Sequence, residues 1–285
     1  MKKIVNAITV IGAGTMGRGI AYASGLAGYV TKLYDVEIKI LNTAVENITN
    51  SFRQAVDKTL LSQDAVDQAL ACLKIFTDLP TAAGDADFVI EAVPEKIDLK
   101  IELFRKLDEM TPPHAIFATN TSSLSVTEMA GATKRPGQVI GMHFFNPVPL
   151  MKLIEIIRGL ETSDETIAAT QEVAQMMKKE TVLINESPGF ITTRINAMIG
   201  NEAFYLLQEG VASAREIDKA LKLGLNHPMG PFELVDLVGL DVRLNILNFL
   251  HQTLGEKFRP CPLMVKYVKA GRLGRKVGKG VYDYS

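Results

Sequence analysis

The first two thirds of the chain alternate short apolar runs with longer segments whose apolar residues recur at helical spacing. The clearest runs are rich in β-branched residues and cover 7–11, 31–34, 87–93, 115–119 and 139–145. Short apolar runs that alternate with helical segments are typical of parallel strands joined by helices. The pattern therefore predicts an α/β fold built on an open, mostly parallel sheet.

Residues 40–72 depart from this alternation and predict a helical insertion beside the sheet, with a second helix over 65–72. The apolar positions expected on one face of the first helix are Ile48, Phe52, Ala55, Val56, Leu60 and Leu61. Its polar side would carry Ser51, Arg53 and Lys58, either as a solvated face or as a clasp for an anionic substrate.

From Phe190 onward the strand pattern is absent and helical spacing dominates. The helical segments expected there are 190–208, 216–223, 231–238 and 242–254. The chain is therefore expected to divide into an α/β domain over 1–185 and an all-helical domain over 186–285.

Two features of the second domain bear on partners. Apolar residues are more numerous than one small bundle needs, which predicts a subunit interface. These positions are Met198, Phe204, Leu206 and Leu207. The basic, glycine-rich tail over 271–280 is either a solvated terminus or a loop that folds back toward phosphates.

The composition excludes several classes of function. With 47% hydrophobic and 22% charged residues, the chain is too apolar for intrinsic disorder. The formal net charge of −1 provides no basic field, so neither nucleic acid nor an anionic membrane is expected as a partner. Cys72 and Cys261 make no disulfide framework and no metal cluster, so no metal site is expected, and they fit a reducing cytosol.

Nothing in the sequence predicts export or membrane insertion. No apolar stretch is long enough to span a membrane. Met1-Lys2-Lys3 and the apolar residues after it resemble a signal peptide, but the apolar run continues into the first strand, which cleavage would destroy. A cytoplasmic protein is expected.

The sequence Gly12-Ala13-Gly14-Thr15-Met16-Gly17 lies between the first predicted strand and a helical segment. A strand, a Gly-x-Gly-x-x-Gly turn and a helix form the dinucleotide-binding unit of Rossmann-type domains. Gly12 allows the tight turn, Gly14 lets the backbone approach a pyrophosphate, and Gly17 lets the helix pack on the strand. The free N–H groups at the helix N-terminus would then face the anion.

Asp35 ends the second predicted strand, roughly 20 residues after the glycine turn. A carboxylate at this position accepts hydrogen bonds from both ribose hydroxyls of an adenosine and repels a 2′-phosphate. The expected cofactor is therefore NAD rather than NADP.

Later strand ends carry polar residues, at the edge where open α/β sheets bind their ligands. The strand over 115–119 ends in Asn120-Thr121-Ser122-Ser123, which are either ligand contacts or ordinary turn formers and helix caps.

A second candidate site lies where the chain is expected to fold back about Pro149. His143 and Glu155 lie at equal sequence distances from that bend and would face each other on neighbouring strands. A carboxylate bonded to one imidazole nitrogen fixes the tautomer, raises the base strength and leaves the other nitrogen for proton transfer. We expect His143 to act as a general base oriented by Glu155.

Taken together, these residues resemble the L-3-hydroxyacyl-CoA dehydrogenase family, most closely its bacterial 3-hydroxybutyryl-CoA members. The resemblance covers essentially the whole chain, and its His-Phe-Phe-Asn-Pro and Met-Gly-Pro stretches are far more specific than the glycine turn. The motifs that carry it are Gly12–Gly17, Asn120–Leu124, Gly141–Pro147, Met151–Glu155, Pro188–Phe190, His227–Phe232 and Gly278–Tyr284.

The resemblance implies a role for individual residues. His143 would be the catalytic base, Glu155 its orienting carboxylate, and Ser122 the hydrogen-bond partner of the substrate 3-oxygen near the nicotinamide. The implied cofactor contacts are Gly12, Ala13, Gly14, Thr15, Met16, Gly17, Asp35, Glu95, Lys100, Ser122, Asn146 and Lys276. The implied acyl-CoA contacts are Ser51, Lys58, Lys100 and Ser122.

One position departs from the family pattern. The family usually has Asn in Pro-Gly-Phe-x-x-Asn-Arg, whereas this chain has Thr193 there. Threonine keeps a hydroxyl but loses the reach and the second hydrogen-bonding group of the amide. Either Thr193 or Asn196, about one helical turn further on, would then contact the substrate.

The resemblance implies NAD-dependent interconversion of (S)-3-hydroxyacyl-CoA and 3-ketoacyl-CoA, with 3-hydroxybutyryl-CoA as the expected substrate. It also implies a place in fatty-acid or butyrate metabolism and a homodimer or a higher homo-oligomer. Two alternatives stay open. One is a dehydrogenase of another small hydroxyacid, and the other is a non-catalytic nucleotide-binding protein that has kept the fold.

Overall fold

The computed structural model describes residues 5–284 and divides into two compact units, Met1–Ser187 and Pro188–Ser285. Met1, Lys2 and Lys3, compared above with a signal peptide, lie outside the described residues. Within the described residues, no helix combines the length and apolar character needed to cross a membrane.

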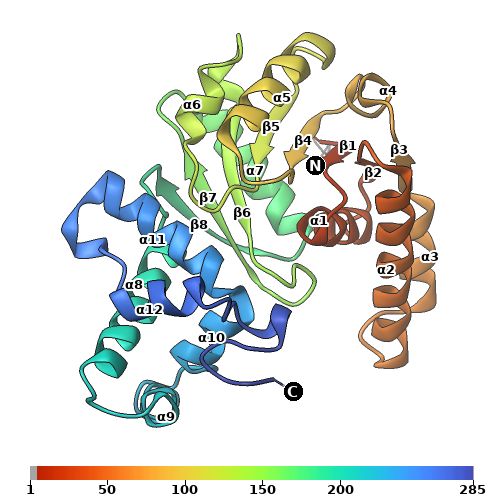
Figure 1. Cartoon of the computed structure of the whole chain (residues 1–285). Coiled ribbons are helices and arrows are strands. Elements are labelled where there is room, and N and C mark those ends of the chain that lie inside the picture. The colour runs from red at the N-terminus through yellow and green to blue at the C-terminus, as the bar shows by residue number, and fades with distance from the viewer. Residues whose placement is uncertain (1–4, 285) are drawn as a thin grey trace. The chain divides into compact units, whose positions relative to one another are not determined.

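An eight-stranded sheet organises the first unit (Figure 1). Its strands are β1 (Ala7–Ile11), β2 (Val30–Tyr34), β3 (Leu73–Phe76), β4 (Phe88–Glu91), β5 (Ile116–Thr119), β6 (Val139–Phe144), β7 (Leu153–Arg158) and β8 (Glu180–Asn185). Their order is β3-β2-β1-β4-β5-β6-β7-β8. Strands β1 to β6 are parallel, β7 runs antiparallel to β6, and β8 runs parallel to β7. The predicted α/β class of Rossmann type is confirmed.

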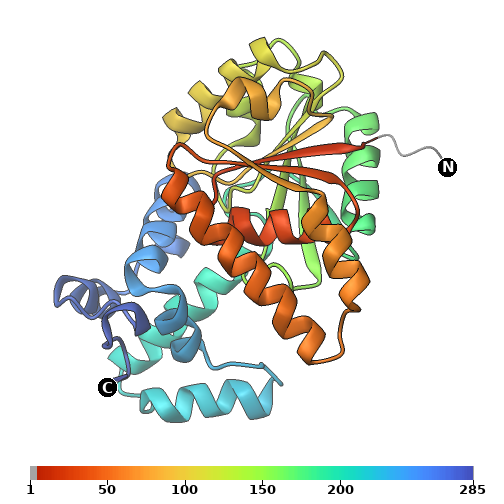
Figure 2. The ribbon, with the colours of Figure 1, turned by 90° about the vertical axis from the view of Figure 1, so that its right-hand side faces the viewer.

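Helices cover both faces of this sheet (Figures 1 and 2). One face carries an apolar core formed with α1 (Thr15–Leu26), α2 (Ile38–Asp57), α3 (Gln63–Ala71) and α7 (Asp164–Met176). The other face carries α4 (Leu79–Ala83), α5 (Ile97–Met110) and α6 (Val126–Ala130).

The alternation of side chains along each strand assigns them to these two faces. Ile8 and Val10 of β1 belong to the core with α1. Thr9 points the other way, and its hydroxyl donates a 2.7 Å hydrogen bond to the carbonyl of Ala82 in α4. Because both faces are covered, the strands are nearly continuous apolar runs, which is the pattern the sequence shows.

The order of the strands reverses at β1, which pairs with β2 on one side and with β4 on the other. In open α/β sheets, ligands bind in the crevice outside the carboxyl ends of the strands at such a point. The glycine turn follows β1 and therefore lies at this crevice.

The predicted insertion is present as the helix pair α2 and α3 between β2 and β3. Phe52 of α2 is buried and stacks on Tyr22 of α1, with ring centroids 4.1 Å apart. Leu60, expected on the buried face, is instead 69% exposed, because α2 ends at Asp57 and helical spacing no longer applies there.

The second unit is helical, as predicted. Its helices are α8 (Thr192–Gln208), α9 (Ala214–Gly224), α10 (Pro231–Val238), α11 (Leu240–Leu254) and α12 (Pro262–Lys269). Helix α12 was not among the helical segments expected from the sequence, where Pro260 and Pro262 indicate a break. Proline at the first position of a helix is in fact favourable, since the N–H it lacks would have no partner there.

The apolar residues that suggested a subunit interface contribute to the core of the second unit. Phe204 is fully buried in that core. Met198, Leu206 and Leu207 are partly buried and pack against it. A subunit interface at these positions stays a prediction.

The C-terminal tail folds onto α10 through one buried carboxylate. Asp236 is 1% exposed, and its Oδ1 accepts a 2.8 Å hydrogen bond from the backbone N–H of Val281. Its Oδ2 accepts hydrogen bonds from the Tyr282 N–H and the Tyr284 hydroxyl, both at 2.9 Å. Residues 281–284 are therefore held on this unit. Residues 275–279 of the basic segment 271–280 are exposed, and the choice between a solvated segment and a loop that folds toward phosphates stays open.

We expect Asp236→Asn to loosen this tail. The amide would turn one of the two acceptor oxygens into a donor that faces other donors, at a cost of about 2 kcal/mol in the free energy of unfolding. Chemical denaturation measures the loss, and limited proteolysis locates it in the tail. Asp241→Asn is the control, because its ion pair with Lys276 is partly exposed and worth little. Equal losses in the two variants would contradict the assignment.

Candidate active site

His143 and Glu155 are brought together by the antiparallel pairing of β6 and β7. The register places them directly opposite each other, as the fold-back about Pro149 predicts. The Nδ1 atom of His143 lies 2.8 Å from Oε2 of Glu155, and both side chains are buried. An ionised carboxylate can only accept, so this hydrogen bond places the imidazole proton on Nδ1 and leaves Nε2 as an acceptor.

Ser122 occupies the other side of the imidazole ring. Its hydroxyl oxygen lies 3.1 Å from Nε2 of His143, and it is contributed by the loop after β5. The three side chains form one hydrogen-bonded line, Ser122–His143–Glu155. A substrate oxygen that reaches Ser122 would therefore also meet a nitrogen prepared for proton transfer.

The loop that carries Ser122 is held by Glu95, which follows β4. Oε1 of Glu95 accepts a 2.9 Å hydrogen bond from the backbone N–H of Ser122 and another from the Thr121 hydroxyl. Asn120 has a structural role, since its Oδ1 accepts a 2.9 Å hydrogen bond from the Phe144 N–H at the end of β6.

The ammonium group of Lys100 is buried and paired with two carboxylates. Its side chain is 1% exposed and lies 2.8 Å from Oε2 of Glu91 and 3.0 Å from Oε2 of Glu95. That Lys100 contacts the cofactor or acyl-CoA, as the resemblance implies, stays a prediction.

The glycine turn has the geometry that a dinucleotide requires. Gly12 has a φ of +97°, and a Cβ there would lie 2.6 Å from the Ala92 carbonyl oxygen. A Cβ on Gly17 would lie 1.7 Å from the Gly12 carbonyl oxygen, so α1 packs against the turn only because Gly17 has no side chain. Apart from Gly14 itself and its two chain neighbours, no heavy atom of the described residues would lie within 4 Å of a Cβ on Gly14, so this position faces open space.

A cavity of about 480 Å³ opens in front of the turn. Its lining residues are Gly12, Gly14, Thr15, Met16, Tyr34, Asp35, Val36, Ile40, Ala92, Val93, Pro94 and Leu99. Oδ2 of Asp35 accepts a 2.9 Å hydrogen bond from the Ala13 N–H, so the carboxylate is held against the turn. Val36, Ile40 and Leu99 are exposed apolar side chains at the same cavity and suit the flat face of an adenine. The residues present therefore fit a dinucleotide.

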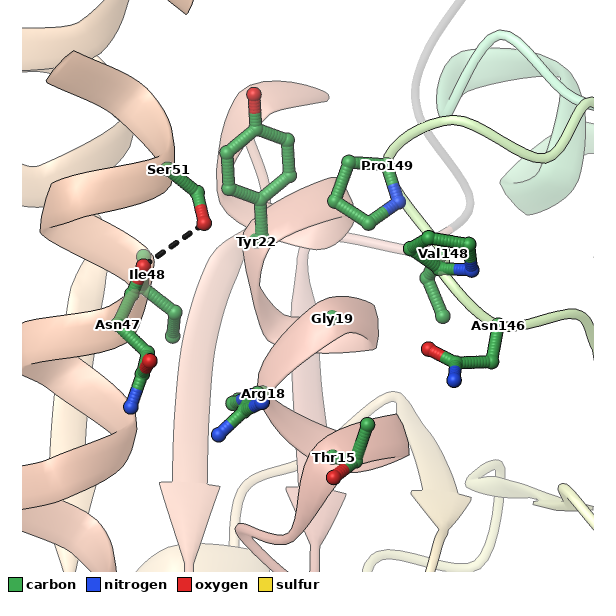
Figure 3. A pocket seen from close by; sticks show the side chains of 11 residues that line it. Thr15, Arg18, Gly19, Tyr22, Asn47, Ile48, Ser51, Asn146, Val148 and Pro149 are labelled. Atoms are coloured by element: carbon green, nitrogen blue, oxygen red, sulfur yellow. Dashed lines mark hydrogen bonds between the residues drawn. The ribbon is translucent and has the colours of Figure 1, made fainter. Parts of the chain in front are cut away.

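Ser51 and Lys58 line a separate groove of about 370 Å³, formed by α1, α2 and the loop after β6. Ser51 and Asn146 both line a smaller cavity of about 150 Å³, which Figure 3 shows. Arg53, a third candidate for the clasp, lines neither space. Its Nη1 lies 3.5 Å from Oδ1 of Asn50.

Thr193, Asn196 and Lys276 belong to the second unit. Thr193 and Asn196 lie in the first turns of α8. Nζ of Lys276 donates 2.6 Å hydrogen bonds to both carboxylate oxygens of Asp241. That these three residues contact substrate or cofactor stays a prediction.

Two family models match the chain and account for nearly all of it. Residues 7–187 match the model described as "3-hydroxyacyl-CoA dehydrogenase, NAD binding domain". Residues 189–284 match "3-hydroxyacyl-CoA dehydrogenase, C-terminal domain". The chain belongs to the 3-hydroxyacyl-CoA dehydrogenase family. The first match identifies the dinucleotide as NAD, and the resemblance stated from the sequence is confirmed.

Individual relatives agree with the family models. The chain is 46% identical over 281 residues to the probable 3-hydroxybutyryl-CoA dehydrogenase of Bacillus subtilis (strain 168), covering 98% of each chain. It is 44% identical over 285 residues to the 3-hydroxybutyryl-CoA dehydrogenase of Bradyrhizobium diazoefficiens, covering 100% of this chain and 97% of that protein. Among solved structures, the (S)-3-hydroxybutyryl-CoA dehydrogenase PaaH1 from Ralstonia eutropha has a TM-score of 0.95, with 41% identity and 99% of each chain covered.

Two charged residues near the site were missed by the sequence analysis. Glu91 ends a strong apolar strand, and an acid at a strand end could have been noticed there. Arg18 follows the glycine turn directly and lines the smaller cavity. The sequence does not show that Arg18 faces α2, because the packing of α2 against α1 depends on how the inserted helix pair folds.

Two substitutions test separately the packing role of Gly17 and the ligand-binding role of Gly14. Gly17→Ala should lower the free energy of unfolding by about 3 kcal/mol, because the new methyl collides with backbone rather than with a movable side chain. Gly14→Ala should leave unfolding unchanged and weaken NADH binding at least about tenfold, because its methyl enters the space that a pyrophosphate needs. Thermal denaturation and NADH fluorescence titration distinguish the two. Unweakened NADH binding by Gly14→Ala would show that this space is not the pyrophosphate site.

Proposed function

We propose that this protein is an NAD-dependent dehydrogenase that interconverts (S)-3-hydroxyacyl-CoA and 3-ketoacyl-CoA, with 3-hydroxybutyryl-CoA as its substrate. The observation that carries the proposal is the buried His143–Glu155 pair with Ser122 in hydrogen-bond contact. This pair lies at the same edge of the sheet as the glycine turn, because both follow the carboxyl ends of parallel strands, β1 and β6. Open α/β sheets bind their ligands at this edge.

In the oxidation direction, Nε2 of His143 takes the proton of the 3-hydroxyl group. Glu155 stabilises the imidazolium that forms, and the Ser122 hydroxyl polarises the substrate oxygen. A positioned general base of this kind contributes about 10²–10⁴-fold to the rate. NAD, when bound, accepts the hydride that leaves C3 of the substrate. In the reverse direction His143 returns the proton to the ketone oxygen.

The choice of NAD over NADP is supported by Asp35. Its carboxylate lines the nucleotide cavity and is fixed by the Ala13 N–H at 2.9 Å and the Glu37 N–H at 3.2 Å. A carboxylate fixed there repels a 2′-phosphate and accepts hydrogen bonds from the ribose hydroxyls.

The choice of a CoA thioester is supported by the groove beside α2. Lys58 and Ser51 lie along its wall and are exposed, so a long anionic ligand can reach both. The relatives named above as 3-hydroxybutyryl-CoA dehydrogenases align over the whole chain, the groove included.

We further propose a cytoplasmic homodimer or larger homo-oligomer, acting in fatty-acid or butyrate metabolism. The free thiols Cys72 and Cys261 suit a reducing compartment.

The direct test is NADH oxidation with acetoacetyl-CoA, run beside free acetoacetate and beside NADPH. Rapid loss of NADH absorbance that requires the CoA thioester supports the proposal. Activity with free acetoacetate would favour a dehydrogenase of another small hydroxyacid. NADH binding without oxidation of either substrate would favour the non-catalytic alternative.

His143→Gln should abolish most turnover while leaving the affinity for NADH nearly unchanged. Glutamine fills similar space and can still bond to Glu155, but it cannot take a proton near neutral pH. Steady-state kinetics should show a kcat at least about 10²-fold lower, and fluorescence titration should show an unchanged NADH dissociation constant. A variant that turns over like the wild type would exclude His143 as the base.

A further inference from the structure

The cavity of about 150 Å³ between α1, α2 and the loop after β6 is lined by Ser51 and Asn146, but no ligand group has been assigned to it so far. Figure 3 shows Arg18 and Tyr22 on α1, Asn47 and Ser51 on α2, and Asn146 on the far side. The lining is completed by Thr15, Gly19, Ile48, Pro147, Val148 and Pro149. Most of its polar groups are uncharged, and Arg18 is its one charged side chain.

Arg18 is a cation without an ionic partner. Its side chain is half-buried, and none of the residues from 5 to 284 places a carboxylate oxygen within 4 Å of its guanidinium. The polar neighbours on α2 are already engaged as donors, since Asn47 Nδ2 donates to the Thr43 carbonyl and Ser51 Oγ to the Asn47 carbonyl. Arg18 is therefore the group on these two helices that can still donate several hydrogen bonds into the cavity.

The cavity continues into the groove that holds Lys58. The two spaces share Tyr22, Ser51, Pro147 and Pro149 in their linings. By contrast, the cavity shares only Thr15 with the nucleotide cavity in front of the glycine turn. At its other end it is lined by Asn146, three residues beyond His143 on the same segment. Arg18 thus lies on a path from Lys58 toward the proton-transfer site.

We propose that Arg18 binds the diphosphate of acyl-CoA. The inference rests on the proposed function, because it takes acyl-CoA as the substrate. Along CoA the phosphorylated ribose, the diphosphate and the pantetheine arm follow in this order. The proposal places the phosphorylated ribose at Lys58, the one charged residue that lines the groove, and the acyl end at His143, so that the diphosphate falls at Arg18. A guanidinium suits this group, because its fork of N–H donors binds two phosphate oxygens at once.

The test compares Arg18→Ala with the wild type on two substrates. Acetoacetyl-CoA carries the diphosphate, whereas acetoacetyl-N-acetylcysteamine carries the same reacting thioester without phosphates. Arg18→Ala should raise the KM for acetoacetyl-CoA about tenfold, because a charge-assisted bidentate contact is lost. The KM for the short thioester, the KM for NADH and kcat should stay unchanged. Arg105→Ala is the control, since Arg105 is exposed on α5 and lines neither space.

Each other result overturns the proposal. An equal rise in KM for both thioesters would show a general disturbance of the site. A rise in the KM for NADH alone would assign Arg18 to the diphosphate of the cofactor, and an equal effect of Arg105→Ala would indicate long-range electrostatics. Should the wild type fail to reduce acetoacetyl-CoA, the proposed function fails. Calorimetric titration with free CoA then still tests Arg18, with equal affinity in both proteins as the result against it.

An independent observation concerns Glu91, which is completely buried. Its carboxylate accepts hydrogen bonds from Lys100 Nζ at 2.8 and 2.9 Å, from the Thr119 hydroxyl at 2.6 Å and from the Val93 N–H at 2.7 Å. Lys100 also reaches Glu95, which holds the Ser122 N–H at 2.9 Å. A continuous line of charged contacts therefore runs from Glu91 to the loop that carries Ser122.

We infer that Glu91 is a positioning residue that fixes Ser122 beside His143 through Lys100 and Glu95. Without its charge, Lys100 would have only Glu95 as an ionic partner and would draw that carboxylate inward. Glu95 would then release the Ser122 N–H, and the hydroxyl would lose its alignment with Nε2.

A double-mutant cycle tests this line of contacts. Glu91→Gln should lower kcat about tenfold in the wild-type background and cause no further loss in Ser122→Ala, where there is no hydroxyl to align. An equal loss in both backgrounds would show that Glu91 acts independently of Ser122. Should Glu91→Gln fail to fold, Glu91→Asp, which keeps the charge but shortens its reach toward Lys100, should give a smaller loss with the same dependence on Ser122. An undiminished kcat in a folded variant also contradicts the inference.

Discussion

The antiparallel pairing of β6 with β7 is the constraint on which the reacting groups depend. It interrupts an otherwise parallel sheet, and its register alone sets a histidine opposite a glutamate at hydrogen-bond distance. A shift of one residue would turn Glu155 to the opposite face and bring an isoleucine beside the imidazole. Because the apolar side chains that flank Glu155 along β7 are buried in the core, such a shift would also remove them from that core. Packing of the core therefore protects the geometry of the site.

Around this pair, the loops at one edge of the sheet are tied together by polar contacts between neighbouring strand ends. Asn120 joins the end of β5 to the end of β6, and Glu95 joins the end of β4 to the loop after β5. Each contact connects segments distant in the sequence but adjacent in the sheet order. The site is thus assembled from strand ends, and the sheet keeps them at fixed spacing.

Much of the fold could be predicted from the sequence, because strand and helix periodicities are local signals. The facing positions of His143 and Glu155 could also be predicted, since a bend at Pro149 and equal sequence distances determine them. The burial of Lys100 could not, because in the sequence it occupies a polar helical position. Only the packing of α5 on the sheet turns it toward Glu91. Leu60 and α12 were misjudged for a related reason, since helix ends and prolines depend on capping geometry that periodicity does not report.

Helix α1 has a consequence for how such an enzyme can diverge. Its first turn, at Thr15 and Met16, lines the nucleotide cavity, while Arg18, Gly19 and Tyr22 line the space toward α2. One short helix thus lines two separate spaces, the nucleotide cavity and the cavity toward α2. Changes on its outer side can accumulate while the glycine turn stays intact. Descendants could therefore acquire new acyl carriers without having to rebuild their means of binding NAD.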